Sequence, residues 1–190
     1  MIDSVRGLCR LIALRLAVLC LMLLVGSAWL PRIIHARSSN TGALQSFDAA
    51  AAAPRAVEET TAVAIQRDYA HAWRSLVSAL QENRADLLDE NFTGGARQQW
   101  QDAIQAQQQN GLSRRIIDHG HRMRVTFYSL DGSAVQAVDA ADLEIEYRDG
   151  GKLLSSERIQ ARYLVLLTPA ENSWKLRILQ EVPQSALSKP

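Results

Sequence analysis

The stretch ERIQARYLVLLTPAENSWKLRILQEV, residues 157–182, decides the fold that the sequence predicts. Its two parts, 157–167 and 173–182, alternate apolar and polar side chains or nearly so, which is typical of β-strands with one buried face. The link between them, TPAENS, is so short that the two strands must be antiparallel neighbours. We therefore predict a β-hairpin in this part of the chain.

Two further alternating segments precede this hairpin: RMRVTFYS at 122–129 and LEIEY at 143–147. The links LDGS and RDGG both contain Asp-Gly, a strong signal for a hairpin turn. Four strands with such short links form an antiparallel meander. The side chains that the alternation directs inward are Met123, Val125, Phe127, Leu143, Ile145, Tyr147, Ile159, Ala161, Tyr163, Val165, Leu167, Trp174, Leu176, Ile178 and Val182.

Helical spacing replaces this alternation in the part of the chain before the strands. A long helix follows Pro54, a shorter one covers 84–92, and a third runs over 95–109, with Thr93 as its cap. Only these helices can cover the inward face of the sheet. The predicted fold class is α+β, with N-terminal helices packed on a curved, cone-like, four-stranded antiparallel meander. The apolar stripe of the long helix consists of Ile65, Tyr69, Trp73, Leu76 and Leu80.

Three segments give the chain a resemblance to a known superfamily: YAHAWRSLVSAL at 69–80, LLDENFTGGARQQW at 87–100 and WKLRILQEVP at 174–183. The pattern resembles the cystatin-like, nuclear-transport-factor-2-like (SnoaL-like) superfamily. That resemblance implies a sheet wrapped around the first helix. It also implies one of two functions: a small isomerase or dehydratase with a conical pocket, or a non-catalytic domain behind a membrane helix. No catalytic motif of the superfamily is matched, so no catalytic residue is carried over.

The first thirty residues favour a membrane segment. The run LIALRLAVLCLMLLVGSAWL, residues 11–30, is long enough to span a bilayer if its one charged residue, Arg15, reaches the headgroups. Trp29 would then lie at the far interface, and the arginines before the run place the N-terminus in the cytoplasm. The alternative is a secretory signal cleaved after Ala28. Either way, the domain lies outside the cytoplasm, and in the first case it is a single-pass protein of the inner (plasma) membrane.

These observations divide the chain into four parts. Residues 1–35 form the anchor or signal, and 36–56, with Ser, Asn, Gly and an alanine run, are expected to be a flexible linker. Residues 57–183 form the α+β domain, and 184–190 a C-terminal tail.

Composition excludes several kinds of site. The net charge of +1 over 190 residues, with scattered basic residues, argues against a nucleic-acid partner. The two cysteines, Cys9 and Cys20, both precede the domain, so the domain itself has no disulfide, zinc cage or thiol nucleophile. No phosphate loop or nucleophile elbow is present, and we expect no cofactor.

Two histidines are the candidates for chemistry. His119 and His121 share the parity of the inward side chains, where Asp139, Tyr147 and Tyr163 could serve as partners. The first interpretation places the histidines in water at the rim of the sheet. The second gives one of them an acid–base role in a pocket. A metal site would need a third ligand, which the sequence does not supply, so no metal is expected.

Four apolar residues have outward parity and gather toward one end of the sheet. They are expected to bind a protein partner or a second copy through the outer sheet face. A bulge in RYLVLL would instead turn two of them inward. We therefore predict a membrane-tethered interaction or assembly domain without catalytic activity; the alternative is a pocket enzyme of the isomerase or hydrolyase type that uses an inward histidine. The four residues are Tyr128, Leu130, Leu164 and Leu166.

Overall fold

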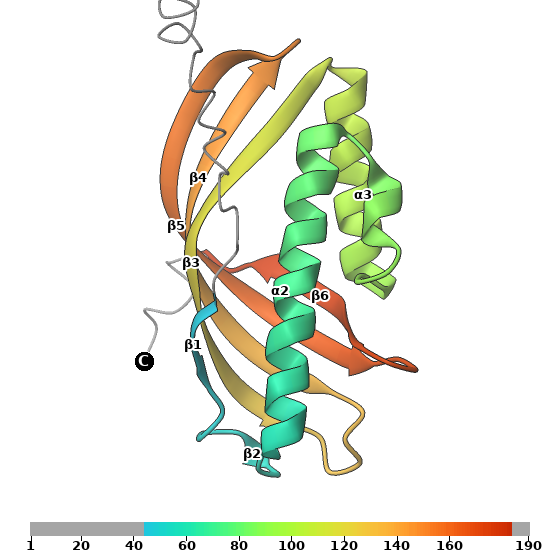
Figure 1. Cartoon of the computed structure of the whole chain (residues 1–190), viewed down its shortest axis with the longest axis vertical. Coiled ribbons are helices and arrows are strands. Elements are labelled where there is room, and N and C mark those ends of the chain that lie inside the picture. Colours follow the sequence, from blue (N-terminus) through green and yellow to red (C-terminus); the bar gives the residue numbers. More distant parts are fainter. Residues whose placement is uncertain (1–43, 184–190) are drawn as a thin grey trace, which may run out of the picture. The chain divides into compact units, whose positions relative to one another are not determined.

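The computed structural model of the chain describes residues 44–183 (Figure 1). The predicted anchor with Arg15 and Trp29, the cleavage site at Ala28 and the tail 184–190 lie outside this range. Within it, no helix combines the length and the apolar character of a membrane span. The elements, in chain order, are β1 (Leu44–Asp48), β2 (Ala53–Pro54), α2 (Glu59–Glu82), η1 (Ala85–Leu88), α3 (Gly94–Gln109), β3 (Leu112–Tyr128), β4 (Val135–Asp149), β5 (Lys152–Pro169) and β6 (Trp174–Glu181).

The sheet contains the predicted meander and two additional strands. Strands β3 to β6 pair antiparallel in chain order, while β1 and β2 both pair parallel with β3. In the part of the chain that the structure describes, the sheet therefore has six strands and is mixed, and the expectation of a four-stranded, purely antiparallel sheet is wrong. Both additional strands come from the segment expected to be a flexible linker. Leu44 and Phe47 pack against the core, and this contact holds β1 in place.

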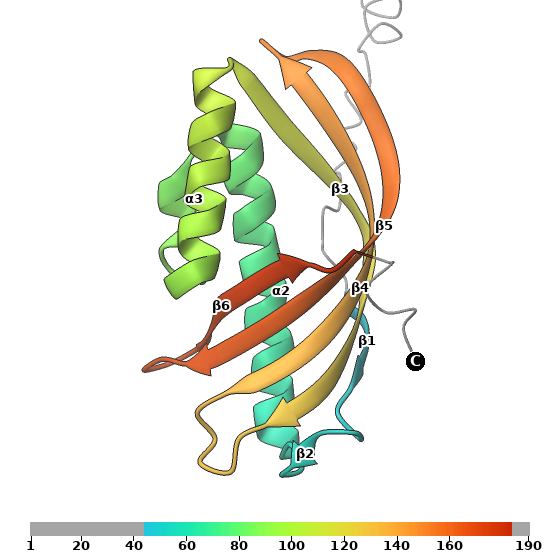
Figure 2. The same ribbon diagram turned by 180° about the vertical axis from the view of Figure 1, so that it is seen from behind.

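Both helices lie on the same side of the curved sheet (Figure 2). The predicted stripe of α2 is buried, because its spacing of three and four residues puts every member on the face toward the sheet. The third helix runs from Gly94 to Gln109 with Thr93 at its N-cap, close to the prediction. The short helix predicted over 84–92 is a single 3-10 turn, after which Phe92 is buried in the core.

Bulges interrupt the alternation of the long strands. The pairing of β3 with β4 shifts between Val125 and Phe127, so Phe127 is exposed and Tyr128 is buried, the reverse of the prediction. A shift in the pairing of β5 with β6 likewise directs Leu179 inward in place of Ile178. One extra residue in a strand reverses the face of every side chain that follows it.

Strand β5 continues well beyond its neighbour β6. The two strands pair only between Tyr163 and Pro169 of β5, so within the described range 44–183 residues 152–161 have no partner strand on this side and form an open edge of the sheet. In Figure 2 the corresponding parts of β3, β4 and β5 extend past β6 and stand opposite α3. Residues 152–158 are exposed on both faces.

Candidate functional site

The two candidate histidines lie on opposite faces of the sheet. A bulge between Asp118 and Gly120 adds a residue to β3, and Gly120 adopts a φ of 138°, which glycine tolerates best. His119 therefore points outward, where its Nε2 lies 3.6 Å from Oε2 of Glu144. His121 points inward and is 1% exposed. The expectation that both histidines face the interior is therefore wrong for His119.

His121 belongs to a buried ionic cluster. Its Nδ1 lies 2.6 Å from Oδ2 of Asp139, and its Nε2 lies 3.0 Å from Oδ2 of Asp118. The hydroxyl of Tyr69, on α2, donates to the same Oδ2 of Asp139 over 2.7 Å. Burial disfavours the charged imidazole, but hydrogen bonds to the two carboxylates outweigh burial and raise the pKa of His121 from 6.5 to about 9. The cluster thus contains a protonated histidine between two carboxylates.

Aromatic rings enclose this cluster. The centroid of the Trp73 ring lies 4.5 Å from that of His121, and the ring of Tyr163 packs edge-on against Trp73 at 5.5 Å. Neither the hollow between α2 and η1 nor the cavity beside Trp73 and Tyr163 is lined by His121. A protonated imidazole with both nitrogens engaged has no free lone pair to accept a proton. The cluster therefore stabilises the contact between α2 and the sheet.

The charge on His121 makes the stability of the domain depend on pH. The favourable contribution is fully present below pH 6.5, the ordinary pKa, and is lost as pH rises through about 9. The difference corresponds to about 3 kcal/mol of unfolding free energy. We expect urea unfolding at pH 6, 7.5 and 9 to show this decline, and His121→Gln to flatten it. His119→Gln, on the outer face, should keep the wild-type profile; an equal flattening there would contradict the assignment.

A cavity of about 220 Å³ lies on the other side of Trp73, between α3 and the strands. Tyr147 and Tyr163, two of the four pocket candidates, line it; His119 and His121 do not. Arg114 was not among the predicted site residues, because the first strand of the meander was predicted to begin at residue 122, whereas β3 begins at Leu112. Ile116, an apolar residue before the predicted start at residue 122, was an indication that the strand begins earlier. The full lining is Trp73, Trp100, Arg114, Ile116, Ile145, Tyr147, Glu157, Ile159, Tyr163 and Glu181.

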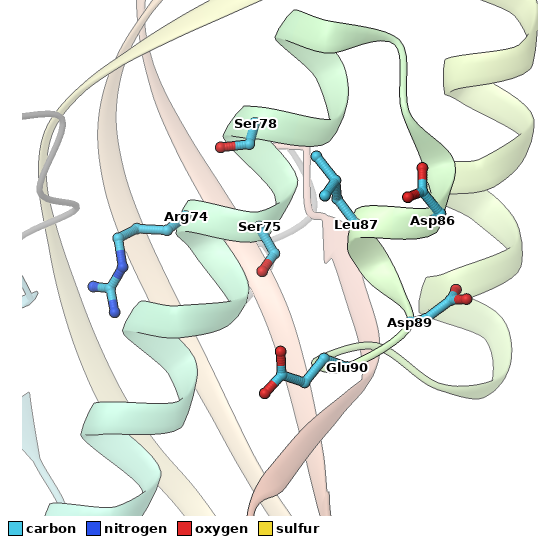
Figure 3. Close-up of a pocket in the computed structure, with 7 residues that line it drawn as sticks. All are labelled: Arg74, Ser75, Ser78, Asp86, Leu87, Asp89 and Glu90. Atoms are coloured by element: carbon cyan, nitrogen blue, oxygen red, sulfur yellow. The ribbon is translucent and has the colours of Figure 1, made fainter.

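A second, larger hollow of about 420 Å³ lies between α2 and η1 (Figure 3). Asp86, Asp89 and Glu90 lie along its η1 side. Asp86 pairs with Arg84, and Asp89 pairs with Arg97, so two of these carboxylates are already neutralised. Across residues 44–183, no group of His, Cys, Asp and Glu side chains could hold a metal ion.

The outer face of the sheet presents an apolar patch, which we call the outer patch. Leu164 and Leu166 keep their predicted outward parity and are partly exposed, since the alternation of β5 is unbroken here. Leu164 pairs with Val138 of β4, and Leu166 pairs with Ile178 of β6. Of the other predicted interface residues, Leu130 is 73% exposed, whereas Tyr128 is buried by the bulge and cannot contribute. The outer patch consists of Val138, Leu164, Leu166 and Ile178.

Three arginines border the outer patch. Arg122 and Arg162 flank Ala140, and Arg124 pairs with Val138. All three are exposed, and none forms an ion pair with another residue of the described range 44–183. The surface therefore combines an apolar centre with a positively charged border.

No protein-family model and no curated protein matches the chain. Among solved structures, it is similar to the intermembrane space region of the chloroplast protein ARC6, with 14% identity, a TM-score of 0.56 and coverage of 69% of this chain and 100% of the other. It is also similar to the protein Aln2 from a Streptomyces species, with 12% identity, a TM-score of 0.47 and coverage of 70% and 97%. The first similarity shows a common fold. Two helices on a curved mixed sheet are consistent with the predicted nuclear-transport-factor-2-like cone.

Proposed function

We propose that this chain is a non-catalytic interaction domain that binds a partner protein through the outer patch. The observation that supports this is the continuity of the apolar side chains across β4, β5 and β6. Contiguous exposed apolar groups are typical of interaction sites. The three unpaired arginines at the border match a partner with an apolar centre and acidic residues around it.

The environment of His121 supports the absence of acid–base catalysis. A general base must reach the proton that it removes, within hydrogen-bond distance of the substrate. His121 lies behind Trp73 and is already bound to two carboxylates. The alternative is a pocket enzyme of the isomerase or hydrolyase type. It is favoured only by the cavity that Tyr147 and Tyr163 line. Such an enzyme would have to use these tyrosines in place of the histidine.

The outer patch is tested by introducing charge into it. We expect Leu164→Glu with Leu166→Glu to leave the circular dichroism spectrum unchanged and to abolish crosslinking of the full-length protein to a partner protein in cells. Crosslinking of the wild type should also weaken with salt, because the arginine border is exposed. The matched control is Leu153→Glu with Leu154→Glu, an exposed apolar pair on the same strand outside the patch.

The results of this experiment distinguish which molecule binds the outer patch. Retained crosslinking in the Leu164/Leu166 variant would contradict the proposed surface. A wild-type protein that sediments as a dimer, and a variant that sediments as a monomer, would identify the occupant as a second copy of the chain.

We further propose that the N-terminal segment tethers the domain outside the cytoplasm. Support comes from the apolar run 11–30, with Arg15 and Trp29 placed for the two interfaces. We expect membrane fractions to retain the full chain, with an N-terminus at or near Met1 by mass spectrometry. A mature chain beginning at Trp29 would instead indicate secretion after cleavage at Ala28.

A further inference from the structure

The 220 Å³ cavity has an apolar interior and a charged opening. Trp73 and Tyr163 are almost fully buried on its inner side, and Ile116, Ile145 and Ile159 extend the apolar wall. Tyr147, Glu157 and Glu181 are exposed. At about 30 Å³ for each water molecule, this space equals about seven waters. It therefore suits a small organic molecule with an apolar body.

A chain of hydrogen bonds positions Arg114 in the wall. Its Nε donates to Oε1 of Gln107, which is buried on α3. The amide nitrogen of Gln107 donates in turn to the carbonyl of Leu80 over 3.0 Å and to Oδ1 of Asn83 over 2.7 Å, both at the end of α2. Among the contacts within residues 44–183, only Nε of Arg114 is engaged, so the two terminal nitrogens of the guanidinium remain for a ligand. A guanidinium with two free nitrogens suits a carboxylate or a similar planar anion.

The cavity is lined by charged side chains of both signs, and some of them act on the hydroxyl of Tyr163. Arg114, Glu157 and Glu181 form no ion pair with each other or elsewhere in residues 44–183. Burial raises the pKa of the Tyr163 hydroxyl, the charge of Glu181 raises it further, and the charge of Arg114 lowers it. The hydroxyl thus remains protonated, and both the carboxylate and the guanidinium lie close enough to affect it. An unpaired cation and unpaired carboxylates therefore share the same cavity.

We propose that this cavity binds a small zwitterion with an apolar body, of the class of the free aromatic and branched-chain amino acids. Its carboxylate binds Arg114, and its ammonium group faces Glu157 and Glu181. Its apolar body packs against Trp73 and Trp100, which also attract a cation by their ring faces. This site goes beyond the proposed partner surface and does not depend on it, since the outer patch lies on the opposite face of the sheet.

The test compares one zwitterion with its two singly charged analogues. Calorimetric titration of the full-length protein with L-phenylalanine, 3-phenylpropanoate and phenethylamine separates the two charged groups, because the analogues lack the amine and the carboxylate respectively. We expect L-phenylalanine, or L-leucine as a second probe, to bind about tenfold more tightly than either analogue, since each charged group adds at least one charge-assisted hydrogen bond. Equal binding of all three, or no binding of either amino acid, would overturn the proposal.

Substitutions in the cavity test which residues bind the carboxylate of the ligand and which bind its ammonium group. Arg114→Met should remove the preference for phenylalanine over phenethylamine, and Glu157→Gln with Glu181→Gln should remove its preference over phenylpropanoate. Arg115→Met, on the same strand but outside the cavity lining and the outer patch, is the matched control and should bind like wild type. The glutamine variant changes exposed residues, so it tests the site even if Arg114→Met fails to fold. An unchanged preference in that variant would exclude the assigned contacts.

Discussion

Asp139→Ala is expected to lower the unfolding free energy by about 3–5 kcal/mol, because it removes one partner of a buried ion pair. Asp139 is 0% exposed, and its Oδ2 accepts hydrogen bonds from both His121 and Tyr69. The substitution leaves the Tyr69 hydroxyl without its acceptor in the core. It also removes one of the two carboxylates that favour the charged form of His121.

Urea denaturation at pH 7 measures the loss, and Asp142→Ala provides the control on the same strand. Asp142 pairs with Arg158 on the outer face, where solvent screens the charges, so its removal should have little effect. If the two variants unfolded at the same urea concentration, the buried cluster would contribute no more than a surface ion pair.

Trp73→Ala should cost a similar amount, about 3–5 kcal/mol, because it leaves a large cavity at the centre of the core. Trp73 is 2% exposed and contacts His121, Tyr69 and Tyr163 through its ring. Trp73 contacts His121 and also lines the 220 Å³ cavity, so the substitution is expected to join this cavity to the space around His121.

The control for this change is Val63→Ala, on the same helix but 60% exposed. It should unfold within about 0.5 kcal/mol of wild type, as surface substitutions usually do. Thermal unfolding followed by far-ultraviolet circular dichroism compares the two variants directly. Equal melting temperatures would show that α2 does not pack on the sheet through Trp73.

The sequence allowed the long elements to be predicted, because many residues contribute to each pattern. The stripe of α2 repeats over several turns, and the short Asp-Gly links leave only an antiparallel meander for β3 to β6. Strand β1 was missed because only Leu44 and Phe47 contact the core, which is too few to show a period. Its parallel pairing with β3 depends on contacts between segments far apart in sequence.

The candidate site could be predicted only in part. Asp139 was correctly associated with the inward histidine, but Asp118 was not considered. The bulge at Gly120 changes which side chains face inward, and alternation alone does not reveal one added residue. A glycine inside a strand was the available signal, since it often marks a bulge. Tyr69 appeared only as part of the stripe of α2, because its hydroxyl contact depends on tertiary packing.

The open edge of β5 also bears on the solubility of the domain. An unpaired strand edge exposes backbone groups to which another chain can add, and long flat edges of this kind promote aggregation. Here the pairing with β4 is interrupted next to Tyr147 and Arg148, which breaks the flat surface. Exposed Glu157 and Arg158 place charges of opposite sign along the same edge. These features oppose the addition of another strand at this edge, although Leu153 and Leu154 are in contact with water.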